Sequence, residues 1–196
     1  MTNPLVLSFD TSAAHVAAAL LCGDEIIARK VDEMKRGQAE RLIPLLKEVL
    51  AEGGKTFADL DAIGVGVGPG NFTGIRISVS AARGLALGLG IPAVGVNSFD
   101  AIEAGLSGDC QAMVTAPRGQ GYLCPKGSTP YLASADEIAR VAQETPLVTP
   151  EATSLVEQIA RLAAQQYQES PARPAPLYIK PADAAPPKDP APVILP

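Results

Sequence analysis

The sequence contains no tryptophan, and aromatic residues make up only 4% of it. The core must therefore be aliphatic and rich in alanine. The chain also has a single histidine, His15. One histidine excludes a zinc site built on a histidine pair and leaves a Ser-His or Cys-His mechanism only one candidate base. Because His15 lies among Ala14, Val16 and Ala17, we expect it to have a structural role.

Cysteines are few, odd in number and far apart: Cys22, Cys110 and Cys124. No two of them form a Cys-x-x-Cys pair, so the sequence indicates neither a disulfide framework nor a thiolate metal site. We expect three reduced thiols that are mostly buried.

Long apolar runs and an excess of basic residues are also missing. No stretch approaches the roughly 18 apolar residues of a membrane span, and Met1–Pro4 carries no basic residue of the kind that opens a signal peptide. We therefore expect a cytoplasmic protein without membrane contact. The 16 basic residues are outnumbered by 21 acidic ones, which gives a formal net charge of −5. Such a chain lacks the overall basic surface on which direct nucleic-acid binding depends.

The first hundred residues carry the clearest secondary-structure pattern. Short connections make the first three strands antiparallel, and later strands alternate with helices, so we predict an α/β fold with a βββαβα order and a mixed sheet. The apolar run at the first strand suits a central position that is buried on both faces. The predicted strands cover 5–9, 16–21, 25–31, 61–67 and 92–96, and the predicted helices cover 38–52, 73–89 and 99–106, the last capped by Ser98.

The second half has a weaker pattern. It predicts a hairpin of 111–115 with 121–124, a helix over 134–143 that begins with a Ser134–Glu137 capping box, a strand at 147–149 and a helix over 153–167. Nine of the chain's 18 prolines follow residue 170, so an extended tail is expected, draped on the body through 177–179 and 193–195. The predicted division is an N-terminal subdomain (1–105), a shortened second subdomain (106–170) and a Pro-rich tail (171–196).

A glycine-rich loop, Gly68 to Gly74, lies between a predicted strand and a predicted helix, where backbone N–H groups and the helix dipole can hold an anion. It lacks the last glycine of a dinucleotide motif and the lysine of a Walker A loop. Two interpretations remain open: an anion site, or a tight connection in which Asn71 or Thr73 caps the helix. The candidate cofactor-binding residues, with the turn that ends the first strand, are Asp10, Thr11, Gly68, Gly70 and Thr73. No carboxylate pair or metal-ligand cluster is evident, so no catalytic or metal-binding residue is predicted.

The two long helices before residue 90 suggest a surface for a partner. Each of Gly84 and Gly88 costs a helix interior about 1 kcal/mol relative to alanine, which close approach of another helix or chain would explain. Arg76 and Arg83 border this face and are either a solvated edge or the rim of an interface. In the helix over 38–52, the apolar residues span about 160° of the wheel, wider than one core stripe needs. Two interpretations remain open: the helix is wedged between its sheet and a neighbouring helix, or part of the apolar arc packs against a second molecule.

The segment from Gly66 to Arg76, GVGPGNFTGIR, resembles the glycine signature of the TsaB (YeaZ) family, the bacterial accessory proteins of threonylcarbamoyladenosine synthesis on tRNA. The likeness extends through 5–12, 36–46 and 84–98. It implies the actin-like ATPase fold shared with sugar kinases, heat-shock proteins and ribonuclease H-like proteins. The chain departs from the family where Gln38-Ala39-Glu40 stands for His-Ser-Glu and where the sequence TAPRGQGY at 115–122 stands for Asp-Ala-Arg-Arg-x-Glu-Val-Tyr.

The resemblance also implies a division of labour. Family members are non-catalytic scaffolds that pair with TsaD, which carries the metal-binding histidines and transfers threonylcarbamoyl to adenosine 37 of tRNAs reading ANN codons; TsaE, an ATPase, joins them. The chain would then have no cofactor of its own, because ATP, ADP and metal would belong to the partner complex. It would contact tRNA only through that complex. The isolated chain would form a homodimer. Candidate interface residues are Arg36, Arg41, Leu42, Leu45, Arg76, Ala81, Gly84 and Gly88.

Two other functions fit less well. A small ATP-dependent phosphotransferase on the same fold would need Asp10 and Thr11 to hold a magnesium-bound phosphate. A metallopeptidase would need a histidine pair or a cysteine cluster, and the sequence has neither.

Overall fold

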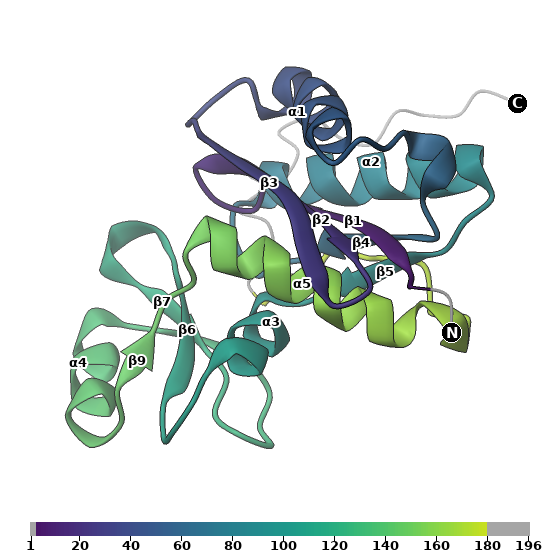
Figure 1. The fold of residues 1–196 in the computed structure, drawn as a ribbon. Helices are drawn as coiled ribbons and strands as arrows, with labels where there is room; N and C mark the ends of the chain where they lie inside the picture. The colour runs from purple at the N-terminus through teal and green to yellow at the C-terminus, as the bar shows by residue number, and fades with distance from the viewer. Residues whose placement is uncertain (1–2, 180–196) are drawn as a thin grey trace, which may run out of the picture.

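The computed structural model describes residues 3–179 and contains two sheets with helices packed around them (Figure 1). The larger sheet has the strand order β3-β2-β1-β4-β5. Strands β1 to β3 are antiparallel, whereas β4 and β5 run parallel to β1. The predicted βββαβα arrangement and mixed sheet are thus confirmed. The strands are β1 (Leu5–Asp10), β2 (His15–Cys22), β3 (Glu25–Glu33), β4 (Ala62–Gly66) and β5 (Ala93–Val96).

Both faces of this sheet are covered by helices (Figure 1). Helices α1 (Gln38–Glu52) and α2 (Phe72–Leu89) pack on one face, and α5 (Ala152–Gln166) packs on the other, next to α3 (Ser98–Gly105). All six residues of β1 are buried, as its apolar run predicted. The sequence grouped α5 with the second subdomain. The structure instead places α5 on the first sheet, because central strands need an apolar helix on each face.

The smaller sheet has the order β8-β7-β6-β9. Its strands are β6 (Gln111–Thr115), β7 (Gly121–Leu123), β8 (Tyr131–Ala133) and β9 (Leu147–Val148), of which β8 was not predicted. The β6–β7 hairpin is confirmed, as is the capping box that begins α4 (Ala135–Glu144). Single 3₁₀ turns lie at Phe57–Asp59, Pro117–Gly119 and Tyr167–Glu169.

Asparagine side chains cap the N-termini of α2 and α3. Asn71 caps α2, with its side-chain oxygen accepting a hydrogen bond from the Gly74 amide at 2.9 Å. The cap of α3 is Asn97 and not Ser98, so that prediction was wrong by one residue. An amide oxygen can accept from the third helical N–H as well as a hydroxyl can. The three cysteines are unpaired, and each is half-buried.

A C-terminal strap, residues 171–179, contains no helix or strand and passes over the glycine-rich loop. The Leu177 amide donates to the Val67 carbonyl at 2.8 Å, and the Tyr178 ring stacks on Phe72 with 4.6 Å between centroids. The expected contact through 177–179 is therefore present, while the expected contact through 193–195 falls outside the described residues. Within the described part of the chain, no helix combines the length and apolarity needed to cross a membrane.

An ion-pair network joins β3 to α1. Arg41 contacts Asp32 and both carboxylate oxygens of Glu48, and Lys30 reaches Glu48 at 2.5 Å. Hydrogen bonds from Arg41 and then Lys30 lower the pKa of Glu48 to about 2. Because the folded-state pKa is depressed, this stabilisation is present above the ordinary glutamate pKa of about 4.5 and is lost as the pH falls toward 2.

We expect Glu48→Gln to remove part of the loss of stability between pH 4.5 and 2. Thermal unfolding followed by circular dichroism across that range would measure it. Glu144→Gln, at an exposed position at the end of α4, is the control and should keep the wild-type slope. Equal pH profiles for wild type and Glu48→Gln would show that the network contributes nothing.

Candidate functional site

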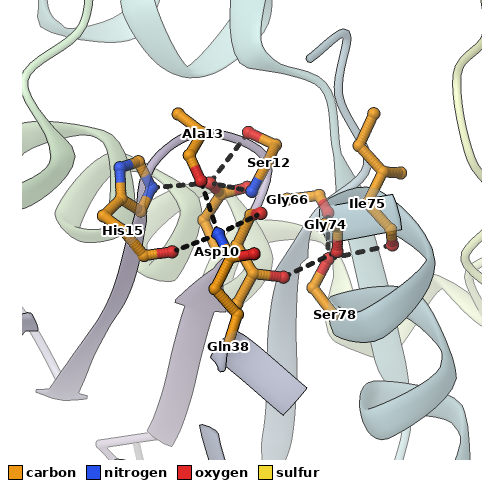
Figure 2. Close-up of polar contacts among 10 residues, drawn as sticks. Asp10, Ser12, Ala13, His15, Gln38, Gly66, Gly74, Ile75 and Ser78 are labelled. Carbon is orange, nitrogen blue, oxygen red and sulfur yellow. Dashed lines mark hydrogen bonds and ion pairs between the residues drawn. The ribbon is translucent and has the colours of Figure 1, made fainter. Parts of the chain in front are cut away.

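The turn after β1 is locked against the glycine-rich loop (Figure 2). The Thr11 hydroxyl donates to the Gly74 carbonyl at 2.6 Å, and the backbone N–H of Asn71 donates to the Ser12 carbonyl at 2.6 Å. On the adjoining side, the Ser78 hydroxyl donates to the Gly66 carbonyl at 3.1 Å. These bonds join β1, β4 and α2 at the edge where both parallel strands end.

Three glycines of the motif make this contact sterically possible. A Cβ on Gly66 would lie 2.0 Å from the Asp10 carboxylate, and one on Gly70 would lie 2.4 Å from the Ser12 carbonyl oxygen. A Cβ on Gly74 would lie 1.9 Å from the Thr11 carbonyl oxygen. These glycines therefore let the turn after β1 approach the loop closely. The interpretation of the loop as a tight connection whose helix is capped by Asn71 is confirmed.

Asp10 lies at the centre of this junction and is fully buried. Its Oδ1 accepts from the Ser12 amide at 2.9 Å and the Ser12 hydroxyl at 2.8 Å, and it contacts His15 Nε2 at 2.9 Å (Figure 2). Its Oδ2 faces Gly66 and has no hydrogen-bond partner among the described residues. The imidazole of His15 is nearly buried and held by Asp10, which is consistent with the expected structural role, and His15 also borders the cleft described below.

Gln38 closes the loop from the α1 side, a role the sequence analysis missed. The side-chain amide donates to the Ala13 carbonyl at 2.6 Å and the His15 carbonyl at 3.1 Å (Figure 2). Where the family pattern has a histidine before its serine, this chain uses a glutamine to satisfy loop carbonyls. The residue before the helix, Gly37, has a φ of 83° and provides no side-chain cap. No local pattern signals a contact between residues so far apart in the chain.

The five cofactor candidates are not brought together as an anion cradle. Asp10 and Thr11 are buried and bonded within the chain. Gly68 faces the Ile75 side chain, and Thr73 lies exposed outside the cleft described below. Only Gly70 borders that cleft. The backbone N–H groups of Asn71 and Gly74 could have faced an anion, but they already donate to the Ser12 carbonyl and to the Asn71 side chain. Among residues 3–179, no group of three or more His, Cys, Asp or Glu side chains could hold a metal ion.

A cleft of about 990 Å³ opens beside this junction. One wall is formed by the loop after β1, by the residues around Gly70 and by Lys35 in the β3–α1 loop. The opposite wall is formed by the β6–β7 hairpin with Arg118 at its turn, and the strap adds its last three residues. The size is in the range of small-molecule sites.

The structure corrects the predicted partner surface on α1. Leu42 and Leu45 are buried beneath the helix and pack on the first sheet, so they cannot meet a partner. Arg41 is engaged with Asp32 and Glu48. The wide apolar arc of α1 is covered within the chain because the helix lies in the angle between the sheet and α2.

The surface candidates on α2 divide into two groups. Arg76 donates to the Tyr178 hydroxyl at 2.9 Å and lies 3.9 Å from the Phe72 ring centroid, so it holds the strap. Ala81 is half-buried against the core. Gly84 and Gly88 are exposed, and a Cβ on either would have no neighbour within 4 Å. Arg36, in the loop before α1, is also exposed.

Leu87 lies between these two glycines in sequence and is 84% exposed. The sequence analysis did not single out Leu87, because periodicity does not say which face of a mixed helix is left without a neighbour. Leu87 borders a groove of about 550 Å³ between the C-terminal end of α2 and the strap. Arg83 and Arg173 are the charged residues along this groove.

The central position of β1, with β2 and β3 antiparallel on one side and β4 and β5 parallel on the other, defines the actin-like ATPase (ribonuclease H-like) fold. Two solved structures share it. A crystal structure from Pseudomonas aeruginosa, described as a protein with similarity to peptidase YeaZ, has a TM-score of 0.71 over 90% of this chain and all of its own chain, at 22% identity. YeaZ from the same organism has a TM-score of 0.66 over 89% of this chain and 99% of its own, also at 22% identity.

The sequence comparisons give the family. Residues 25–179 match the family model of TsaD, tRNA N6-adenosine threonylcarbamoyltransferase. Uncharacterised proteins from Mycobacterium tuberculosis and Mycobacterium bovis are 32% identical over 119 residues, which is 60% of this chain. The match spans 56% of each relative's length. The chain therefore belongs to the TsaD family.

Proposed function

We propose that this chain is a non-catalytic scaffold that pairs with a TsaD-like subunit, and with a TsaE-like ATPase, for threonylcarbamoyl transfer to adenosine 37 of tRNAs that read ANN codons. The match to the family model of tRNA N6-adenosine threonylcarbamoyltransferase supports this choice of reaction. The scaffold role is supported by the buried, internally bonded state of Asp10 and Thr11, which leaves these two residues unavailable to a substrate.

The exposed face of α2 is the observation that carries the pairing proposal. Glycine within a helix is unfavourable by about 1 kcal/mol relative to alanine, and the described part of the chain contains nothing near Gly84 or Gly88 that requires it. Leu87 lies between these glycines in the sequence, and most of its side chain is exposed to solvent. Small residues beside one large apolar residue allow a second helix to approach closely and then bury that residue. The interface is therefore centred on α2 and not shared equally with α1.

Charge also restricts the partner surface. The groove beside Leu87 is bordered by Arg83 and Arg173 and by no acidic residue within the described chain. A partner helix that carries acidic residues around an apolar centre would complement it. In the absence of that partner, we expect the isolated chain to pair with itself through the same α2 face.

The phosphotransferase alternative loses its support in the structure. It needs Asp10 and Thr11 to face a magnesium-bound phosphate. Both side chains are buried and bonded within the chain, Asp10 to Ser12 and His15, and Thr11 to the Gly74 carbonyl. The cleft has no carboxylate on its walls within residues 3–179, so it offers no protein ligand of the kind magnesium prefers.

Reconstitution tests the proposed function directly. The purified chain should neither hydrolyse ATP nor modify tRNA, whereas addition of TsaD-like and TsaE-like subunits should yield threonylcarbamoyladenosine, measured by nucleoside mass spectrometry. The same subunits without this chain are the control. Modification by this chain alone would overturn the scaffold assignment, and full activity of the other subunits without it would overturn the requirement for pairing.

A further inference from the structure

The strap forms part of the wall of two separate hollows. Its last three residues border the cleft beside the junction. Near its other end, Pro171, Arg173 and Pro174 border the groove beside Leu87, at the C-terminal end of α2. Because the strap contains no helix or strand, no helical or ladder hydrogen bonds fix these parts of the two walls. The shape of both hollows therefore depends on what holds this one segment in place.

The strap also links the cores beneath the two sheets. The Leu177 side chain packs against the core that the first sheet forms with α1 and α2. Ile179, two residues further on, packs against the cluster formed by residues of α3 and β6. The buried Pro174 lies against Gly95 of the edge strand β5, where an added Cβ would be 3.3 Å from the proline. The strap is therefore a brace from the edge of the first sheet to the core of the second.

Few hydrogen bonds hold the strap to the rest of the chain. Three of its nine residues are prolines, which have no backbone N–H to donate. Within residues 3–179, a single backbone hydrogen bond joins the strap to the body, from the Leu177 N–H to the Val67 carbonyl. A segment with so few bonds can open locally while the sheets and helices stay folded. The position of the strap therefore depends on its side-chain contacts.

One cluster of side chains fastens the strap to the start of α2. The Tyr178 ring stacks on Phe72, and the Arg76 guanidinium lies 3.9 Å from the Phe72 ring centroid. Arg76 Nε also donates to the Tyr178 hydroxyl at 2.9 Å. We call Phe72, Arg76 and Tyr178 the latch. Aromatic stacking and cation–π attraction are each modest at an exposed site, so this latch can open and close reversibly.

We propose that the latch couples the cleft to the groove beside Leu87. While Arg76 holds Tyr178, the strap completes both walls, and when the latch opens, both walls are released together. Arg76 is a positioning residue, because it borders neither hollow and acts on both through the strap. The effect on pairing rests on the proposed function, in which a TsaD-like subunit covers this groove. A partner that contacts Arg173 in the closed strap binds the closed state more tightly and shifts the latch toward it.

Hydrogen–deuterium exchange of the isolated chain, followed by mass spectrometry, tests the coupling. In Arg76→Ala, we expect exchange of the strap to become about fivefold faster or more, and exchange of the β6–β7 hairpin to rise with it. The hairpin responds because Ile179 no longer packs on the second sheet. Tyr178→Phe keeps the stacked ring and loses only the hydroxyl, so its exchange should be intermediate.

Lys47→Ala is the control, since it removes an exposed cation from α1 that borders neither hollow, and it should exchange as wild type does. Circular dichroism confirms that each variant is folded. Unchanged exchange of the strap in Arg76→Ala would overturn the latch. Faster exchange of the strap with no change in the hairpin would overturn the coupling.

A second measurement adds the TsaD-like subunit. Its binding should slow exchange of both the strap and the hairpin in wild type, whereas in Arg76→Ala the hairpin should keep its faster exchange. Affinity of Arg76→Ala for the subunit should fall by about fivefold or more, measured by interferometry. Protection of the strap alone, without the hairpin, would overturn the coupling. If wild type does not bind the subunit, the proposed function fails, and exchange in the isolated chain still decides whether the latch acts on both hollows.

Discussion

Gly74→Ala is expected to unfold or nearly unfold the protein, whereas Gly84→Ala in the same helix is expected to stabilise it. The Cβ of alanine at 74 would lie 1.9 Å from the Thr11 carbonyl oxygen, which is backbone and cannot turn away. We expect a cost of about 3 kcal/mol or more, because β1 and α2 must separate to relieve the clash. The cost is a large share of a typical stability of about 5–15 kcal/mol.

At position 84 the same added methyl group meets no atom within 4 Å. Alanine there should raise the free energy of unfolding by about 1 kcal/mol, because it restricts the unfolded chain and favours the helix. Urea unfolding monitored by circular dichroism would measure both variants. If Gly74→Ala were tolerated, the junction would not be tight, and a destabilised Gly84→Ala would show that the chain itself covers this face.

Leu87→Asp is expected to abolish pairing with the TsaD-like subunit and to leave the isolated chain folded. Leu87 is 84% exposed, so the carboxylate remains hydrated in the free protein. In the complex it would be buried at the centre of the proposed interface. We expect affinity to fall by about 100-fold or more, which corresponds to ~2.8 kcal/mol. Gly84→Leu should have a similar effect by keeping the partner helix at a distance.

Biolayer interferometry with the TsaD-like subunit would measure this loss, and light scattering would report whether self-pairing is lost with it. Ala142→Leu, which adds apolar surface at an exposed position on α4, is the matched control and should bind as wild type does. Unchanged affinity of both α2 variants would move the interface to another face. Loss of affinity in Ala142→Leu as well would point to aggregation and not to a defined interface.

The sequence alone was enough to predict the order of strands and helices around the first sheet. Local signals carry that information: the apolar run of β1 and the Asn71 cap of α2 each depend on neighbours a few residues away. The glycine motif also indicated the family through its resemblance to the family signature, and the structure shows that three of its glycines make contacts that tolerate no side chain. A pattern along the chain is therefore a good guide to backbone conformation.

Only the tertiary structure decided which surfaces are free. The wheel of α1 predicted spare apolar area, yet Leu42 and Leu45 are covered because the helix lies between the sheet and α2. The small face of α2 was equally compatible with internal packing, and only the absence of neighbours around Gly84 within the described chain resolved the question. Likewise, the sequence left Asp10 as a candidate to hold a magnesium-bound phosphate, and only the structure showed that its carboxylate is bonded to Ser12 and His15. Whether a side chain is exposed depends on segments far away in the sequence, and the periodicity of a single helix carries no information about those segments.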